Sequence, residues 1–204
     1  MIKDKNNLLK KIENNINITL ELGCGSKKRI DNAIGIDQLD FECVDIVGDL
    51  FEVLSHFKDN SVNKIFSSHV FEHIEDLQKL MEECSRVLRN EGTLEIIVPH
   101  FSNPYFYSDY THKRFFGLYS LSYFAESNVF KRRVPLYGLN LPLKIDNVVL
   151  IFRGERPFYI RHMFGKILTA LFNSSNFIKE FYEVNLCYLF PCYEIRYIVK
   201  KYLI

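Results

Sequence analysis

The stretch that decides the fold is Thr19-Leu20-Glu21-Leu22-Gly23-Cys24-Gly25-Ser26, together with the later Ile34-Gly35-Ile36-Asp37. An apolar strand leads into a loop with two glycines, and a second short strand ends on an acid. Glycine lets the backbone approach a ligand closely and adopt dihedral angles that a Cβ disfavours. Asp37 stands where the acids of nucleotide-binding α/β folds accept hydrogen bonds from a ribose. These features predict a nucleoside-containing cofactor lying across the ends of parallel strands.

The dinucleotide-binding fingerprint fits this stretch poorly. That fingerprint needs a third glycine and an acid roughly 20 residues further on. Lys28 stands in place of the third glycine, and Asp37 follows Gly25 by only twelve residues. The string Glu-Leu-Gly-Cys-Gly over 21–25 instead resembles the first motif of class I S-adenosylmethionine-dependent methyltransferases.

Three further blocks resemble that family in order and spacing, so the resemblance spans roughly Asn17 to His112. They are a third strand that ends on an acid, a fourth strand with its turn, and a turn with the fifth strand, over 44–50, 62–74 and 88–99. The second glycine of the last turn is Thr93 here. The chain also resembles the small methyltransferases often encoded with bacterial surface-polysaccharide genes, through a D-x-T-H-K-R-F-F segment at 109–116.

The resemblance implies a Rossmann-like α/β fold, with a mostly parallel sheet and a C-terminal antiparallel pair, and S-adenosylmethionine as the cofactor. The glycine loop would face the amino acid portion of the cofactor, Asp37 the ribose hydroxyls and Asp49 the adenine. His69 would contact the cofactor, unless it only packs at a strand end. The implied cofactor-binding residues are Glu21, Gly23, Gly25, Asp37, Asp49, Leu50 and His69.

The loop after the fifth strand is expected to build the acceptor site. Methylation of a hydroxyl requires removal of its proton, and a histidine with a near-neutral pKa suits that task. His100, His112 and Asp109 are therefore the candidate catalytic residues. Asp109 and His112 are three positions apart, so on one helical turn the carboxylate would orient the imidazole.

Three residues of the same loop, Tyr107, Lys113 and Arg114, are expected to bind the acceptor. In the alternative interpretation His112 joins the two cations and only binds an anionic acceptor. His73 is expected to be structural, as a cap or as a partner of a nearby acid. A metal-dependent enzyme would need a cluster of acids and histidines, and Asp109 with His112 is too small a set, so no metal is predicted.

Length and composition favour one domain over 1–204, with a helical insertion at 154–190. The chain has 48% hydrophobic and 25% charged residues, which is ordinary for a globular protein. Five cysteines without C-x-x-C spacing favour reduced thiols in a cytoplasmic protein over disulfides or a zinc site. The sequence shows neither a membrane-spanning run nor a secretory signal.

Charge is distributed unevenly. Residues 1–110 hold 12 Lys/Arg and 19 Asp/Glu, whereas residues 111–204 hold 14 Lys/Arg and 6 Asp/Glu. The basic half, including the run at 131–133, would suit an acceptor that bears phosphate, or it is simply solvated. The sequence contains no RNA-binding module, so nucleic acid is not expected as a partner.

Periodicity predicts strands near 18–22, 33–36, 44–47, 63–68 and 93–98, and a helix over 74–89. The gaps between the first three strands are too short for ordinary crossover helices. A helix over 120–128 and an antiparallel pair at 145–153 and 193–201 are also expected. Residues 1–16 are expected to form a short helix or a frayed tail.

The segment 157–190 is aromatic and helix-like, with cations near its start at Arg156, Arg161 and Lys166. Its roles as a lid, a dimer surface or a membrane-edge helix are all open. An apolar face formed by residues 164, 167, 168, 171 and 172 is expected to pack on the sheet of the same chain or on a second subunit of a homodimer. Peripheral membrane contact is less favoured, because the polar face has no sustained basic stripe.

The sequence therefore predicts an S-adenosylmethionine-dependent methyltransferase. The acceptor implied by the resemblance is an oxygen of a sugar or a related surface-polysaccharide precursor of capsule or O-antigen type. A small-molecule or lipid-associated methyltransferase, or a non-catalytic S-adenosylmethionine-binding subunit, are the alternatives.

Overall fold

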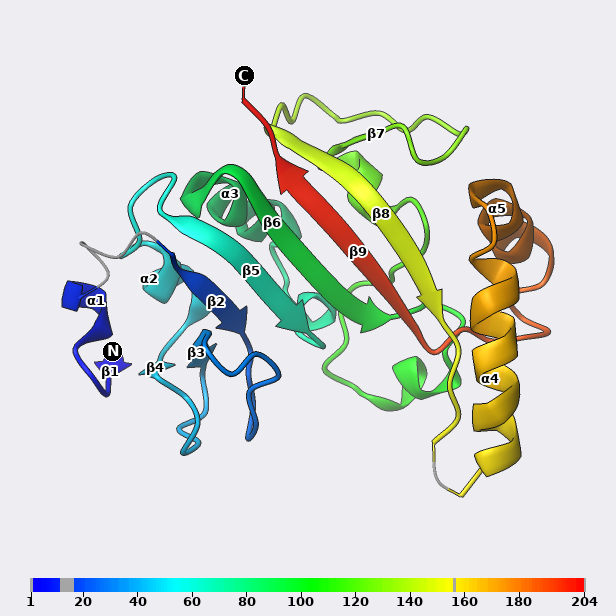
Figure 1. The fold of residues 1–204 in the computed structure, drawn as a ribbon, viewed down its shortest axis with the longest axis horizontal. Coiled ribbons are helices and arrows are strands. Elements are labelled where there is room, and N and C mark those ends of the chain that lie inside the picture. The colour runs from blue at the N-terminus through cyan, green and yellow to red at the C-terminus, as the bar shows by residue number, and fades with distance from the viewer. Residues whose placement is uncertain (1, 12–16, 156, 204) are drawn as a thin grey trace.

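The computed structural model describes residues 2–11, 17–155 and 157–203. Within that part of the chain one mixed sheet contains nine strands in the order β1-β4-β3-β2-β5-β6-β9-β8-β7 (Figure 1). The strand bounds are β1 Lys3–Asp4, β2 Thr19–Leu22, β3 Ile34–Asp37, β4 Ile46–Val47, β5 Val62–Ser68, β6 Leu88–Pro99, β7 Glu126–Ser127, β8 Leu143–Ile151 and β9 Glu194–Lys201.

Helices are few and short beside this sheet. The α-helices are α1 Leu8–Lys11, α2 Leu50–Leu54, α3 Leu77–Val87, α4 Tyr159–Phe172 and α5 Asn176–Asn185. Three 3₁₀ turns are η2 Phe71–His73, η3 Pro104–Ser108 and η4 Ser120–Tyr123. None of the helices described is long and apolar enough to cross a membrane.

Five neighbouring strands, β4, β3, β2, β5 and β6, run parallel, and β9 lies antiparallel between β6 and β8. The mostly parallel α/β sheet and the C-terminal antiparallel pair are therefore confirmed. The shortened early crossovers are also as predicted, since the described segments 23–33 and 38–45 contain turns and bends instead of helices. The carboxyl ends of the parallel strands meet along one edge of the sheet (Figure 1).

Several predicted elements have different boundaries or a different type. The helix expected over 74–89 begins only after Asp76, whose side chain caps it at Lys79 N, and ends at Val87. The strand expected over 93–98 begins already at Leu88, which is extended and pairs with Val62 before an irregularity in the register. The helix expected over 120–128 is only the 3₁₀ turn η4 followed by β7. Of the N-terminal segment, β1 and α1 are described, and 12–16 lie outside the described residues.

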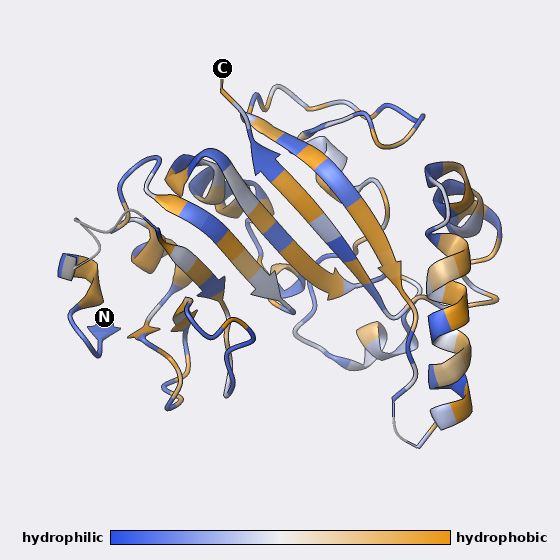
Figure 2. Cartoon of the chain, viewed as in Figure 1, coloured by the Kyte–Doolittle hydropathy of each residue, from blue (hydrophilic) through white to orange (hydrophobic). Residues whose placement is uncertain are grey.

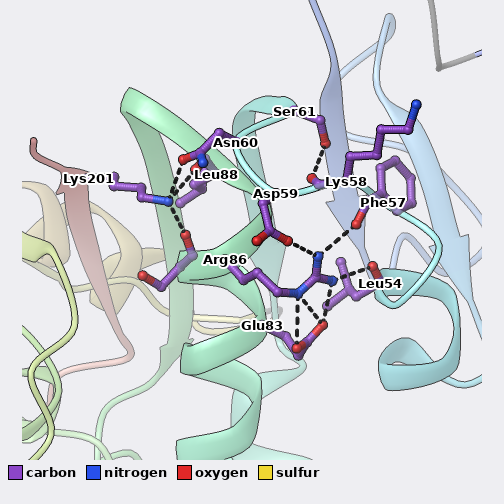
Figure 3. A network of polar contacts seen from close by, with 11 residues as sticks. Leu54, Phe57, Lys58, Asp59, Asn60, Ser61, Glu83, Arg86, Leu88 and Lys201 are labelled. Atoms are coloured by element: carbon purple, nitrogen blue, oxygen red, sulfur yellow. Dashed lines mark hydrogen bonds and ion pairs between the residues drawn. The ribbon is translucent and has the colours of Figure 1, made fainter.

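Two cations fasten the amino-terminal edge of the sheet (Figure 3). Arg86 of α3 donates to the carbonyls of Leu54 and Phe57, and it pairs with Glu83. Lys201, buried at the end of β9, donates to Ser85 O and Leu88 O and to the Asn60 side chain. Burial lowers the pKa of the Lys201 ammonium. These contacts hold the end of the sheet opposite to the parallel strands' carboxyl ends.

Helices α4 and α5, here called the α4–α5 arm (residues 159–185), stand beside the β8 edge (Figure 1). A Cβ on Gly165 would lie 2.4 Å from Phe152 O, so only glycine allows α4 to approach the strand end this closely. Thr169 Oγ1 accepts from Phe152 N, and the Asn173 side chain bonds both Leu150 N and Leu150 O. A narrow stripe of α4 therefore attaches the arm.

The apolar face predicted on this helix is mostly uncovered. Phe172 is buried and Leu168 is partly buried, but Phe164 and Ile167 remain 60% and 63% exposed. Much of the α4 ribbon has hydrophobic colouring although it lies at the margin of the molecule (Figure 2). Of the two expected partners of this face, the sheet of the same chain leaves Phe164 and Ile167 uncovered, because the narrow contact at Gly165 reaches only one side of the helix. The other expected partner, a second subunit, stays a prediction.

Candidate functional site

The glycine loop after β2 has the backbone conformation that its sequence predicts. Gly23 and Gly25 have φ angles of 64° and 60°, in the left-handed region that favours glycine. A Cβ on Gly23 would lie 2.1 Å from a methyl carbon of Val70, whereas no described atom lies within 4 Å of the Cβ position of Gly25. The loop is thus packed closely at its first glycine and open at the second, where a ligand can approach the backbone.

Asp37, at the end of β3, is the polar centre of this loop. Its Oδ2 accepts from Gly25 N at 2.8 Å, and its Oδ1 accepts from Leu39 N at 2.9 Å. A carboxylate has about four acceptor positions, so each oxygen retains capacity for a hydroxyl. Asp37 therefore both shapes the loop and presents acceptors to a ligand.

Glu21 shapes the other side of the same loop. It is buried in β2, and its carboxylate accepts from the backbone N–H groups of Arg29 and Ile30. With Gly23, Ser68 and His69 it lines a hollow of about 680 Å³. Ser68 Oγ is buried and has no hydrogen-bond partner within the described residues. These features fit a polar ligand portion such as an amino acid moiety.

A second hollow of about 490 Å³ adjoins the first, and Gly23 and His69 line both. Apolar side chains form much of its wall, and its lining residues are Gly23, Gly25, Asp37, Gln38, Leu39, Phe41, Leu50, His69, Val70, His73 and Ile74. Two adjacent hollows, one polar and one partly apolar with a ribose acceptor at its edge, fit the two ends of S-adenosylmethionine. We call them together the cofactor cleft.

Asp49 occupies a different place from the other predicted contacts. It caps α2, where its Oδ1 accepts from Phe51 N and Glu52 N. Leu50 lines the cofactor cleft, and Asp49 is not among the residues described as lining it. The contact of Leu50 is thus supported by position, and the contact of Asp49 with adenine stays a prediction.

His69 follows β5 with a φ of 58° and lies between two acids. Its Nε2 is 2.6 Å from Glu194 Oε1, and its Nδ1 is 3.2 Å from Glu72 Oε1. Burial lowers the pKa of His69, but its hydrogen bond with Glu194 and its charge interactions with Glu194 and Glu72 outweigh that effect and raise the pKa to about 9. Arg153 also pairs with Glu194 at 3.2 Å. A protonated imidazole therefore lies where the two hollows meet.

The acceptor loop is held against η2 by main-chain bonds. Lys113 N and Arg114 N both donate to the carbonyl oxygen of Glu72, at 2.7 and 3.1 Å. The Lys113 ammonium pairs with Glu75 at 3.0 Å, and the Arg114 guanidinium donates to the carbonyls of Ile74 and Glu75. Both predicted acceptor-binding cations thus already contact the turn after β5.

This attachment brings His112 beside His73, with their ring centroids 4.8 Å apart. His112 Nδ1 donates to Phe106 O at 2.8 Å, so the carbonyl of Phe106 orients the ring. The predicted orientation by the carboxylate of Asp109 is not observed, because Asp109 Oδ2 lies 3.6 Å from Nε2 and Asp109 instead accepts from Thr111. A single turn does join the two residues, since His112 N donates to Asp109 O at 3.3 Å, but within it the Asp109 carboxylate accepts from Thr111.

The remaining predicted residues lie away from the cleft lining. The side chain of His100 is fully buried, with Nε2 3.2 Å from Glu183 and Nδ1 2.8 Å from Ser102 Oγ. A general-base role for His100 would require rearrangement and stays a prediction. Tyr107 is exposed, and its hydroxyl donates to Phe101 O.

The basic run at 131–133 is not among the residues that line the cofactor cleft. It follows β7, which pairs with the start of β8, and that start pairs with the end of β9. The end of β9 pairs with Thr93 and Leu94 in the amino-terminal half of β6. Lys131 N donates to Glu180 of α5 at 3.3 Å, so a role of this run in binding a phosphate-bearing acceptor stays a prediction.

Sequence reasoning missed several members of the site. Glu194 is 125 positions from His69 and lies in an ordinary strand pattern, so nothing local marks it. Cys43 donates to Gly25 O at 3.2 Å from the turn after β3. Glu72 and His73 lie in the turn after β5. An acid next to a histidine at this place was the local feature of the sequence that could have revealed this part of the site.

Comparisons with known proteins agree with this geometry. Residues 25–96 match the family model of a methyltransferase domain. The match includes Asp37, Asp49, His69 and the whole turn after β5. No curated protein matches the chain.

Solved structures share the fold. A SAM-dependent methyltransferase from Archaeoglobus fulgidus superposes with a TM-score of 0.56 and 18% identity, over 96% of this chain and 90% of that one. The geranyl diphosphate C-methyltransferase of Streptomyces coelicolor A3(2), solved with Mg²⁺, geranyl diphosphate and S-adenosylhomocysteine, gives 0.53 and 13%, over 97% and 77%. The chain thus contains a match to a methyltransferase domain over residues 25–96, on a fold that it shares with S-adenosylmethionine-dependent methyltransferases.

Proposed function

We propose that this enzyme transfers the methyl group of S-adenosylmethionine to an oxygen of a sugar or related surface-polysaccharide precursor. The observation that carries the proposal is the attachment of the 109–116 segment at the mouth of the cofactor cleft, through the two bonds to Glu72 O. This segment is also the one that resembles small methyltransferases encoded with surface-polysaccharide genes. A polar, histidine-containing acceptor wall suits a hydroxyl better than a carbon nucleophile.

The reaction needs little beyond position and proton removal, because the sulfonium of the cofactor is already an activated leaving group. The acceptor oxygen bonds to the methyl carbon, the carbon–sulfur bond breaks, and S-adenosylhomocysteine leaves. The hydroxyl proton passes to a side chain of the acceptor loop, for which His112 and Asp109 are the candidates. Asp37 and the glycine loop hold the cofactor during this step.

Lys113, Arg114 and Tyr107 are proposed to position the acceptor. The Lys113 ammonium is about half exposed and its ion pair with Glu75 is on the surface, so an anionic acceptor can replace the glutamate. Surface ion pairs are weak, and exchange of one partner costs little. Arg114, which contacts main-chain carbonyls, would act by holding the loop in place.

A screen tests this function. The purified protein is incubated with S-adenosylmethionine and a panel of nucleotide sugars and capsule or O-antigen intermediates, and S-adenosylhomocysteine is measured. A product methylated on oxygen, identified by mass spectrometry, is the expected result. Turnover only with lipids or with non-sugar small molecules would overturn the sugar assignment, and the uncovered apolar face of α4 makes lipid-linked acceptors the comparison class.

A further inference from the structure

The side chains of Glu72, His73 and His112 converge beside the cofactor cleft. Glu72, His73 and His112 each offer one potential ligand atom, and these atoms all lie within 4.8 Å of one another. We propose that Glu72, His73 and His112 bind a divalent transition-metal ion of the zinc type. This site differs from the expectation of a metal-free enzyme, which rested on Asp109 and His112 alone.

Glu72 supplies the first line of support. Its side chain is fully buried, and neither carboxylate oxygen has a hydrogen-bond partner within the described residues. His69 Nδ1 approaches Oε1 to 3.2 Å, but the contact does not have hydrogen-bond geometry. An ionised carboxylate that is buried with unused acceptor positions is costly unless a cation or donors compensate it. The His69 imidazole at 3.2 Å compensates Oε1 in part, and a bound metal would provide a partner for the remaining acceptor positions of the carboxylate.

The tautomers of the two histidines are the second observation that supports a metal site. His112 Nδ1 faces the Phe106 carbonyl, which can only accept, so this nitrogen carries the proton. Thr111 Oγ1 donates to Asp109 Oδ1 at 2.5 Å and therefore accepts from His73 Nδ1 at 2.8 Å. Both rings are thus left with a lone pair on Nε2. A metal-binding histidine typically donates its other N–H to a carbonyl or to a carboxylate-linked group in this way.

The chemistry of the ligand set selects the ion. Two imidazoles and one carboxylate form the ligand set of catalytic zinc sites, which keep a further position open, and harder ions such as Mg²⁺ and Ca²⁺ prefer oxygen ligands. Three ligands about 2.1 Å from one ion lie at most about 4.2 Å apart. The three groups must therefore approach one another slightly, which rotation of the partly exposed His73 allows.

The location gives the ion a role. His73 lines the cofactor cleft, so the open position of the ion would face the space where an acceptor meets the cofactor. An acceptor hydroxyl bound there has a lowered pKa. Its proton can then pass to the exposed carboxylate of Asp109, while His112 serves as a ligand. This role rests on the proposed function, whereas the binding of the ion does not.

Metal binding is tested directly, without any acceptor. Zn²⁺ is titrated into the chelator-treated protein by calorimetry, and Co²⁺ serves as a probe whose visible absorption reports its ligands. The expected result is one ion per chain. His73→Ala and His112→Ala should each weaken binding by more than the 10–100-fold that loss of an outer-shell partner costs, and Glu72→Gln should do the same. Thr111→Val, which removes the partner of His73 Nδ1, should cost about 10–100-fold.

The control is His56→Ala, because His56 is exposed and lies outside the cluster. It should bind Zn²⁺ as the wild type does. If Glu72→Gln fails to fold, His112→Ala with an unchanged melting shift by S-adenosylmethionine still decides the matter, because His112 is not among the residues that line the cleft. Absence of stoichiometric Zn²⁺ binding, unchanged binding in the histidine variants, or a Co²⁺ spectrum with thiolate bands would overturn the proposal. A protein that binds Zn²⁺ but methylates no sugar would contradict only the proposed function.

Discussion

Two regions of the molecule have an unusual distribution of side chains. The acceptor side of the cofactor cleft buries a charged group, whereas the α4–α5 arm exposes apolar groups. Beside the cleft, the carboxylate of Glu72 is buried and accepts no hydrogen bond from the described residues, although His69 pairs with it at 3.2 Å. On the arm, Phe164 and Ile167 are exposed to solvent. Both arrangements are unfavourable for an isolated chain. The difference indicates two kinds of missing partner, a small polar ligand at the cleft and an apolar surface at the arm.

The largest expected effect is on catalytic turnover, which should depend on the acceptor side of the cleft and not on the arm. His112→Ala should lower turnover by about 10²–10⁴-fold, the usual contribution of proton transfer, because it removes either the proton acceptor itself or a ligand of the proposed ion that lowers the pKa of the acceptor hydroxyl. Cofactor binding should persist, because His112 is not among the residues that line the cleft. The measurement is single-turnover formation of S-adenosylhomocysteine with an acceptor found in the screen.

His162→Ala on α4 is the matched control, since His162 is exposed and makes only a weak contact with Gly154 O. It should retain near-wild-type turnover. An equal loss in both variants would mean that the arm contributes to the active site. Near-wild-type turnover of His112→Ala would assign proton removal to another group.

A second prediction concerns the cofactor. A ligand that binds only the folded state stabilises it by about 2.7 kcal/mol at a hundredfold excess over its Kd. Asp37→Ala should abolish most of this gain, because the ribose loses its acceptor and Gly25 N loses its anchor. Asp40→Ala is the control, since Asp40 pairs with Lys3 and Lys5 outside the cleft lining. No melting shift of the wild type at millimolar S-adenosylmethionine would contradict the assignment of the cleft.

A third prediction concerns the attachment of the arm. Gly165→Ala should stabilise α4 by about 1 kcal/mol, because alanine has a higher helix propensity than glycine. It also places a methyl group against Phe152 O. Overpacking of this kind costs about 1–3 kcal/mol, so a net loss of stability is expected in denaturant unfolding. Ala170→Gly, on the exposed side of α4, is the reverse control and should cost about 1 kcal/mol through propensity alone. A more stable Gly165→Ala protein would show that the arm is loosely attached.

The smallest effect on stability is expected on the exposed face of the arm. The double variant Phe164→Glu/Ile167→Glu should change the free energy of unfolding by only about 0.5 kcal/mol. If this face forms the predicted homodimer, light scattering should show a dimer for the wild type and a monomer for the variant. Phe172→Glu, at a buried position, is the contrasting control and should unfold the protein.

Vesicle sedimentation distinguishes the other occupant of the face. A wild type that is monomeric and sediments with lipid vesicles, together with a variant that does not, would establish membrane contact and refute the dimer. A wild type that is monomeric and does not sediment with vesicles would refute both the homodimer and the membrane contact.

The sequence predicts the sheet well because its strands are short apolar runs whose order and spacing are local information. The shortened crossovers follow from simple counting between Gly25 and Asp45. Boundaries fail where tertiary pairing extends an element, as at Leu88, which periodicity assigns to a helix but which pairs with Val62.

The cofactor side of the site was predictable for the same reason, since Gly23, Gly25 and Asp37 follow consecutive parallel strands. The acceptor side was less so. Whether His100 is buried, and which acid meets His69, depends on α5 and β9, more than eighty positions further along the chain. The grouping of His112 with Glu72 depends on main-chain bonds that no side-chain pattern encodes.

The missing crossover helix between β2 and β3 has a consequence for how the enzyme can be observed. The middle of this connection, residues 26–32, is held chiefly by the bonds of the Glu21 carboxylate with Arg29 N and Ile30 N and by those of Lys28 with Ala33 O and Asp45. Segments with so few buried contacts open locally at small free-energy cost. Amide hydrogens there should exchange rapidly in the free enzyme and slowly once a ligand covers the loop. Hydrogen exchange at this segment would thus report cofactor occupancy without any acceptor being known.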